Sequence, residues 1–229
     1  MRTFKRETSS LVVVLAASAV LLASAVTSGA ASVPAITLSA PKTGEIKPGP
    51  DGFIRRWLVL EPIAATGLTD SIVQAAVKKG PLATKLTAIP RDGEQVNVES
   101  AQLTWHAEDT SNYNLNLFHV ARSMDKNTSN VLFWAVTVVH APREMRDVRL
   151  AIGSNAASVW WLNGQEVIGI YGDRQTVIDD GVSKRVTLKK GPNVIRGAVV
   201  NGGGATDFCA RILDASDKPL TDIVVNLRP

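Results

Sequence analysis

The sequence predicts an all-β protein, a β-sandwich with one short helix. Short apolar runs recur along the chain, and turn signals separate them about every 8–12 residues, which is typical of sandwiches and barrels. Apolar and polar residues alternate over Val148–Ile152, as they do in a strand with one buried face. The pair Asn163-Gly164 stands between two apolar runs, and Asn-Gly favours a hairpin turn because both residues tolerate positive φ. Together these patterns predict roughly ten short strands.

The N-terminal 31 residues have the order of a secretory signal peptide. Basic residues at Arg2, Lys5 and Arg6 precede the uncharged apolar run Leu11–Val26, and small residues follow it. A single membrane anchor is the alternative, although the run is short for the ~20 residues that a spanning helix needs. We therefore expect residues 1–31 to be removed on export to the periplasm or beyond the cell. We expect no membrane span after cleavage, because no second apolar run of that length follows.

The composition indicates one domain behind an extended lead-in. Residues 32–52 carry four prolines and several Gly, Ser and Thr, which is typical of a linker, and we expect the folded domain to cover residues 53–229. That length can bury a sizeable core. The single cysteine, Cys209, excludes an internal disulfide, and its strand-like context predicts a small buried side chain.

The charge of the chain argues against nucleic-acid binding. The whole chain has 25 Lys and Arg against 21 Asp and Glu, and the part after residue 31 has 22 against 20. A nucleic-acid partner favours a concentrated basic stripe. Here the basic pairs are scattered, at Arg55-Arg56, Lys78-Lys79, Lys184-Arg185 and Lys189-Lys190.

The first half of the expected domain contains the helix. Phe53–Leu60 is a predicted strand that ends at Glu61-Pro62. Thr69-Asp70 then offers an N-cap for a helix over Ser71–Lys79, and Gly80-Pro81 ends it.

Strands are expected from there to the C-terminus. Val131–His140 is almost continuously apolar and β-branched, which predicts a strand buried on both faces. In Val148–Ile152 we expect Val148, Leu150 and Ile152 to face the core. The other predicted strands are Gln95–Val98, Gln102–His106, Tyr113–Ala121, the two arms of Val159–Ile168, Val182–Leu188, Val194–Val200, Phe208–Leu213 and Ile223–Leu227.

Three segments resemble the galactose-binding-like jelly-roll superfamily. They are a strand ending in Gly-Ser-Asn at 153–155, the Trp-Leu-Asn-Gly hairpin at 161–164, and the Leu-Lys-Lys-Gly-x-Asn turn at 188–193. The opening Trp57–Pro62 is similar to the first strand of these modules, although Glu61 replaces a frequent Gly and Pro192 a frequent aromatic. The resemblance implies a jelly-roll sandwich in an exported protein and matches mainly fold-forming residues.

The same resemblance implies carbohydrate recognition. We expect a non-catalytic carbohydrate-binding protein or module associated with polysaccharide degradation. It would act alone or beside a secreted glycan-degrading enzyme. Similar whole chains are sometimes labelled acetylxylan esterase, so a carbohydrate esterase is the alternative. An envelope protein–protein interaction module is the third possibility, because a sandwich does not fix function.

The motifs of a serine esterase or a zinc site are missing from the sequence. The nearest match to Gly-x-Ser-x-Gly is Gly181–Arg185, where Arg185 replaces the second Gly and a strand pattern follows Ser183. The three histidines, His106, His119 and His140, lack the spacing of zinc ligands. We therefore predict no catalytic residue.

One loop has the oxygen-rich composition that calcium prefers. Asp173–Gly181 contains three aspartates, and related jelly rolls often hold a structural Ca²⁺ in such loops. A solvated turn is the alternative. No other cofactor is predicted.

The candidate sugar surface lies around the Asn-Gly hairpin. Adjacent strand residues point to opposite faces, so the resemblance places Trp160 on the core side and Trp161 on the other face. We predict that Trp161, Tyr171, Asp173 and Arg174 form part of a ligand surface, with aromatic faces for a sugar ring and polar groups for its hydroxyls. The alternative is that both aromatics pack under a loop, as large aromatics usually do.

Overall fold

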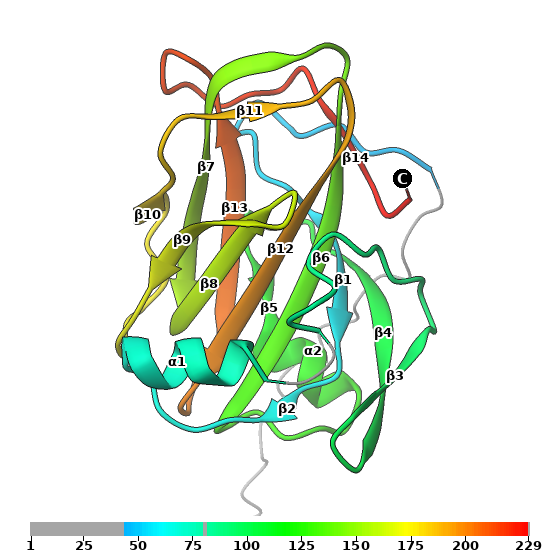
Figure 1. Cartoon of the computed structure of the whole chain (residues 1–229), viewed down its shortest axis with the longest axis vertical. Coiled ribbons are helices and arrows are strands. Elements are labelled where there is room, and N and C mark those ends of the chain that lie inside the picture. Colours follow the sequence, from blue (N-terminus) through cyan, green and yellow to red (C-terminus); the bar gives the residue numbers. More distant parts are fainter. Residues whose placement is uncertain (1–43, 80–81, 229) are drawn as a thin grey trace, which may run out of the picture. The chain divides into compact units, whose positions relative to one another are not determined.

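Strands dominate the part of this protein that a computed structural model describes, residues 44–79 and 82–228 (Figure 1). The predicted signal peptide, 1–31, and residues 32–43 of the predicted lead-in lie outside these residues. In chain order the strands are β1 (Arg56–Leu60), β2 (Ile63–Ala64), β3 (Gln95–Val98), β4 (Ala101–Asp109), β5 (Leu115–Asn116), β6 (Val131–Ala141), β7 (Met145–Asn155), β8 (Ala157–Leu162), β9 (Gln165–Ile170), β10 (Gly181–Val182), β11 (Val186–Leu188), β12 (Gly191–Asn201), β13 (Asp207–Leu213) and β14 (Val224–Asn226). Within the described residues, no helix is long and apolar enough to span a membrane.

The strands form two antiparallel sheets, which confirms the predicted all-β sandwich. The large sheet has nine strands in the order β3-β4-β1-β6-β12-β8-β9, and β2 and β14 also pair with β6. The small sheet has five strands in the order β10-β7-β13-β5, and β11 also pairs with β7. Upstream of the first strand, Ile46 already forms a bridge with Val225 of β14.

The predicted helix is present, and a second helix corrects the prediction. Helix α1 (Asp70–Val77) starts after Thr69 as expected, although the Thr69 side chain makes no capping hydrogen bond. The predicted strand Tyr113–Ala121 is wrong: β5 covers two residues, and helix α2 (Leu117–Ser123) follows. The Asn116 side chain caps this helix by accepting a hydrogen bond from the backbone N–H of His119 at 2.9 Å.

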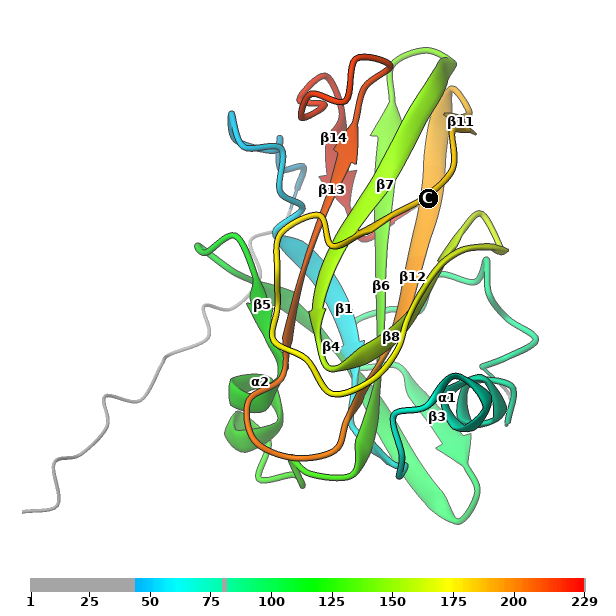
Figure 2. The same cartoon turned by 90° about the vertical axis from the view of Figure 1, so that its left-hand side faces the viewer.

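The large sheet is buried on both faces, which explains the continuous apolar run of β6. The inner cluster lies between the sheets and receives Phe133 and Val139 of β6 together with Leu150 and Ile152 of the small sheet. The outer cluster covers the opposite face of the large sheet and receives Trp134 from β6. Helix α1 packs into the outer cluster and α2 into the inner one, so the two helices lie on opposite sides of the large sheet (Figure 2).

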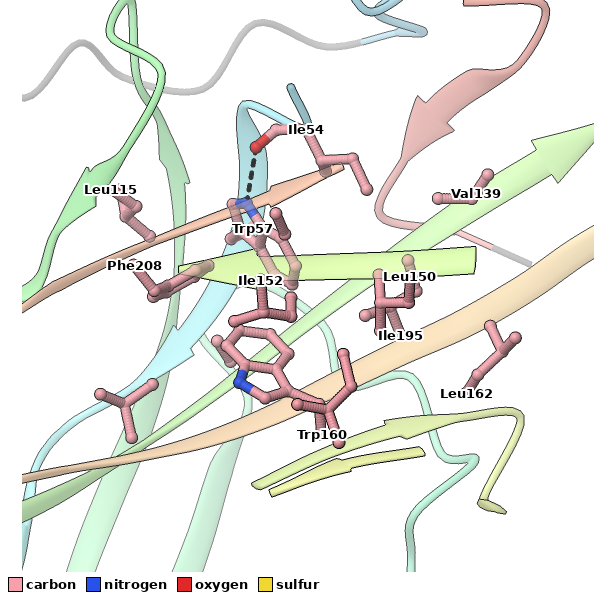
Figure 3. Close-up of a cluster of buried hydrophobic side chains, with 14 of the residues drawn as sticks. Ile54, Trp57, Leu115, Val139, Leu150, Ile152, Trp160, Leu162, Ile195 and Phe208 are labelled. Atoms are coloured by element: carbon pink, nitrogen blue, oxygen red, sulfur yellow. Dashed lines mark hydrogen bonds between the residues drawn. The ribbon is translucent and has the colours of Figure 1, made fainter. Parts of the chain in front are cut away.

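Three aromatic rings form the centre of the inner cluster (Figure 3). Trp57 and Phe208 meet edge to face with ring centroids 4.9 Å apart, and Trp160 packs 5.1 Å from Phe208. Gly197 lies opposite Trp160 in the register of β12 and β8, and an added Cβ would lie 2.3 Å from the Trp160 ring. This glycine therefore makes room for the indole.

The Asn-Gly hairpin forms as the sequence predicts. Asn163 and Gly164 connect β8 to β9 with φ values of 50° and 84°. Trp160 and Leu162 face the inner cluster, whereas Trp161 faces the outer one. The predicted strand Val182–Leu188 is interrupted, because Ser183 and its neighbours separate β10 from β11.

Candidate functional site

A pocket of about 430 Å³ opens over the outer face of the large sheet, beside α1. Three parts of the chain enclose it: the segment from β2 to Thr66, one face of α1, and the turn after β3. Trp134 and Leu132 of β6 also line it. The full lining consists of Ile63, Ala64, Ala65, Thr66, Ser71, Ile72, Ala75, Ala76, Lys79, Leu82, Val98, Glu99, Leu132 and Trp134.

Apolar and polar residues occupy different parts of this lining. Trp134 and Leu132 are 1% and 3% exposed and belong to the sheet, so they lie at the bottom of the pocket. Ser71, Lys79 and Glu99 are exposed and bring a hydroxyl, an ammonium and a carboxylate to the opening. The pocket therefore offers apolar contact below and hydrogen-bonding groups around its mouth.

Local sequence explains why α1 presents this face. Val73 and Val77 are four residues apart and bury on the sheet side of the helix. Ile72, Ala75 and Ala76 then face the pocket, and Ile72 stays 45% exposed. Exposed apolar surface of this kind beside a concavity is typical of binding sites.

Trp161 packs against the floor of this site. Trp161 is 6% exposed, and its ring stacks on Trp134 with centroids 5.6 Å apart and an interplanar angle of 25°. Its position on the outer face agrees with the hairpin prediction. Its burial matches the alternative in which the aromatic packs beneath other elements rather than forming an open platform.

The other three predicted ligand residues lie in the loop after β9. Tyr171 packs against the outer cluster, and its hydroxyl accepts a hydrogen bond from Gln74 of α1 at 2.8 Å. Burial raises the pKa of the Tyr171 phenol above its usual range. Arg174 pairs with Asp180 of the same loop, and Asp173 is exposed. Tyr171, Asp173 and Arg174 do not line the pocket beside α1, and their ligand role remains a prediction.

The acidic loop Asp173–Gly181 is held by ion pairs. Asp179 accepts hydrogen bonds from Nε and Nη2 of Arg211 of β13, and Asp180 pairs with Arg174. Among the described residues, no group of three or more His, Cys, Asp or Glu could hold a metal ion. The carboxylates of Asp179 and Asp180 thus serve as arginine partners in this structure.

The residues weighed for catalysis take structural positions. Ser183 is 1% exposed; its hydroxyl donates to the carbonyl of Lys184 and accepts from the N–H of Leu150. The ring of His140 contacts the carbonyl of Arg228 at 3.0 Å. Cys209 is 2% exposed, as expected, and burial raises the pKa of its thiol to about 11.

A second polar cluster joins His106 of β4 to Glu61, which follows β1, and to Lys126, which follows α2. Glu61 lies between His106, 3.5 Å from Nε2 to Oε1, and Lys126, 3.2 Å from Nζ to Oε2. Glu108 lies on β4 with His106. Burial together with the negative charges of Asp92 and Asp109 raises the pKa of Glu108 to about 7.

The sequence alone did not reveal the pocket. It predicted α1 and β3, but not that they meet above Trp134. The available signal for a pocket was that Ile72 and Ala75 are apolar, although they do not share the helix face of Val73 and Val77. These residues could not indicate which part of the chain lies opposite them.

Comparisons with known proteins found distant structural likenesses. No protein-family model matches the chain, and a search of curated proteins also finds no match. The PA14 sugar-binding domain of an RTX adhesin has a TM-score of 0.43 at 13% identity, over 74% of this chain and 96% of that one. The PA14 domain of the antifreeze protein MpAFP has a TM-score of 0.44 at 10% identity, over 82% and 95%. A β-glucosidase from Kluyveromyces marxianus, solved with glucose, has a TM-score of 0.38 at 19% identity, over 70% of this chain and 18% of that one. With TM-scores below 0.5, these likenesses carry no argument about what this chain binds.

Proposed function

We propose that this protein is a non-catalytic carbohydrate-binding module and that the pocket beside α1 holds the sugar. The observation that carries the proposal is the division of the pocket into an apolar floor and a polar mouth. A pyranose has the matching character, because its C–H groups form apolar patches and its hydroxyls need hydrogen-bond partners. We also propose, from the sequence resemblance, that the chain is an exported jelly-roll module of the galactose-binding-like kind that acts beside a glycan-degrading enzyme.

The size of the pocket suits a small ligand. Its volume of about 430 Å³ lies in the lower half of the usual range for ligand sites, roughly 300–1,000 Å³. We therefore expect it to take one or two sugar rings. Trp134 and Leu132 would contact the ring carbons, and Thr66, Ser71 and Glu99 are placed to bind hydroxyls.

A blocking substitution tests the location of the site. Ala75 is exposed on α1 and lines the pocket, so Ala75→Trp should fill the pocket without entering the core. Ala215→Trp is the matched control, because Ala215 is also exposed but lies in the turn before β14. Affinity electrophoresis through gels that contain xylan, galactan, arabinan or cellulose would detect binding by the unmodified domain.

The two variants give separate expectations. Ala75→Trp should abolish the retardation that one of these polysaccharides causes, whereas Ala215→Trp should keep it. Equal retardation of both variants would place the site elsewhere. Tryptophan fluorescence adds a direct readout, because Trp134 lines the pocket and stacks on Trp161.

A further inference from the structure

Arg196 is a buried cation beside Trp134 of the pocket floor. It lies in the middle of β12, opposite Trp161 of β8, and is 1% exposed. Its Nε donates to the carbonyl of Leu86 at 3.3 Å, and its Nη2 donates to the carbonyl of Ala88 at 2.6 Å. Two backbone carbonyls therefore hold the guanidinium in place.

No carboxylate among the described residues neutralises this charge. Arg196 forms no ion pair in the described part of the chain, and its Nη1 is buried without a hydrogen-bond partner. Burial lowers the pKa of Arg196 to about 10, so the group is still protonated at neutral pH. Buried charges in proteins are usually paired, because an unpaired one loses its hydration without compensation.

Aromatic rings connect Arg196 to the pocket. Its guanidinium carbon lies 5.8 Å from the ring centroid of Trp134 and 5.8 Å from that of Trp105. Trp134 also lines the pocket, so the cation lies against a residue of the pocket floor. The charged residues of the lining itself are Lys79 and Glu99, which carry opposite signs. Arg196 therefore leaves the site with an excess of positive charge.

We infer that the ligand of this pocket carries a carboxylate, and that the protein prefers uronic-acid sugars to neutral ones. The inference rests on the proposed function and narrows its ligand class. The buried surroundings of Arg196 screen its charge poorly, so this charge acts on a ligand in the pocket without touching it. For a cation and a carboxylate about 10 Å apart at an effective dielectric constant of about 20, we expect a preference on the order of tenfold for the acid.

The first experiment uses the unmodified domain and matched ligands. Calorimetric titration would compare D-galacturonate with its methyl ester and with D-galactose, and D-glucuronate with the corresponding neutral forms. The ester keeps the shape of the acid and removes the charge. Each acid should bind roughly ten times more tightly than its ester. Equal affinity of acid and ester would overturn the inference while leaving sugar binding intact. No binding of any of these sugars would also overturn the inference, whereas the polysaccharide gels decide the proposed function separately.

The second experiment identifies the charge responsible. Arg196→Gln removes the charge and keeps an amide that can donate to one of the two carbonyls; Arg196→Lys keeps the charge. The acid-to-ester preference should vanish in Arg196→Gln and persist in Arg196→Lys, and circular dichroism would verify folding. Lys79→Gln should lower the preference in part, because Lys79 also lines the pocket. A preference unchanged in a folded Arg196→Gln would overturn the role of Arg196, and if that variant does not fold, the acid–ester comparison decides.

Discussion

The side-chain Nδ2 of Asn163 donates a hydrogen bond to the Oδ1 of Asn193 at 2.9 Å. This bond joins two turns that lie thirty residues apart. Asn193 is fully buried; its Oδ1 also accepts from the N–H of Lys189, and its Nδ2 donates to the carbonyls of Lys189 and Gly191. In return, the Oδ1 of Asn163 accepts from the N–H of Val194. The β8–β9 hairpin and the turn into β12 are therefore fixed to each other by side chains.

Asn193→Ala should destabilise the domain strongly. The substitution leaves several buried backbone groups and the Asn163 amide without a partner, and each unsatisfied group costs about 1–3 kcal/mol. We expect a loss of at least about 2 kcal/mol in the free energy of unfolding, measured by urea denaturation. Asn226→Ala is the comparison, since Asn226 lies near the C-terminus and is only partly buried. Equal stability of the two variants would contradict the structural role of Asn193.

Gly197→Ala should disrupt the aromatic centre of the inner cluster. The new methyl group would lie 2.3 Å from the ring of Trp160, which must then move against Trp57 and Phe208. Overpacking of this kind costs about 1–3 kcal/mol. Gly203→Ala is the matched control, because the nearest atom to its added Cβ is the Ser129 hydroxyl at 4.0 Å. Thermal unfolding should show a lower Tm for Gly197→Ala alone.

The stability of the domain should depend on the protonation of Glu108. Burial raises the pKa of Glu108 from 4.5 to about 7, so the folded protein binds this proton more tightly than the unfolded chain does. The stability from this group is fully present below about pH 4.5 and is lost as the pH rises through about 7. Glu108→Gln removes the titration, so the stability of the variant relative to the unmodified domain should rise between these pH values and stay higher above pH 7.

The size of the Glu108 effect has an upper bound. A shift from 4.5 to about 7 corresponds to at most about 3 kcal/mol at pH 8. Urea denaturation at pH 4.5 and at pH 8 would measure the difference, and Glu45→Gln at an exposed position controls for the loss of one carboxylate. If the unfolding free energies of Glu108→Gln and of the unmodified domain differ by the same amount at both pH values, Glu108 does not titrate in this range.

The thiol of Cys209 should resist modification in the folded domain. It is 2% exposed, and its raised pKa of about 11 keeps it protonated at pH 8, whereas thiol reagents attack the thiolate. We expect negligible reaction with an aromatic disulfide reagent until urea unfolds the protein. Ala215→Cys supplies an exposed thiol for comparison. Rapid labelling of Cys209 in the native protein would mean that the structure around this buried thiol opens readily.

Local patterns predicted much of the fold, and tertiary contacts decided the exceptions. The sequence predicts a strand over Tyr113–Ala121, yet Leu117, Val120 and Ala121 share the buried face of a helix. Asn116 caps that helix, and burial of its apolar face in the inner cluster stabilises it. Propensity alone could not choose, because both patterns place apolar residues on one side.

The sequence by itself determined the strand alternation, the Asn163-Gly164 hairpin, helix α1 and the opposite directions of Trp160 and Trp161, because each depends on neighbours in the chain. It could not determine the candidate site. The pocket exists only because α1, β2 and the turn at Glu99 meet above Trp134. The burial of Arg196 likewise depends on Leu86 and Ala88, which lie more than a hundred residues earlier in the chain. Such long-range contacts follow from the packing of the large sheet, and no local spacing in the sequence encodes them.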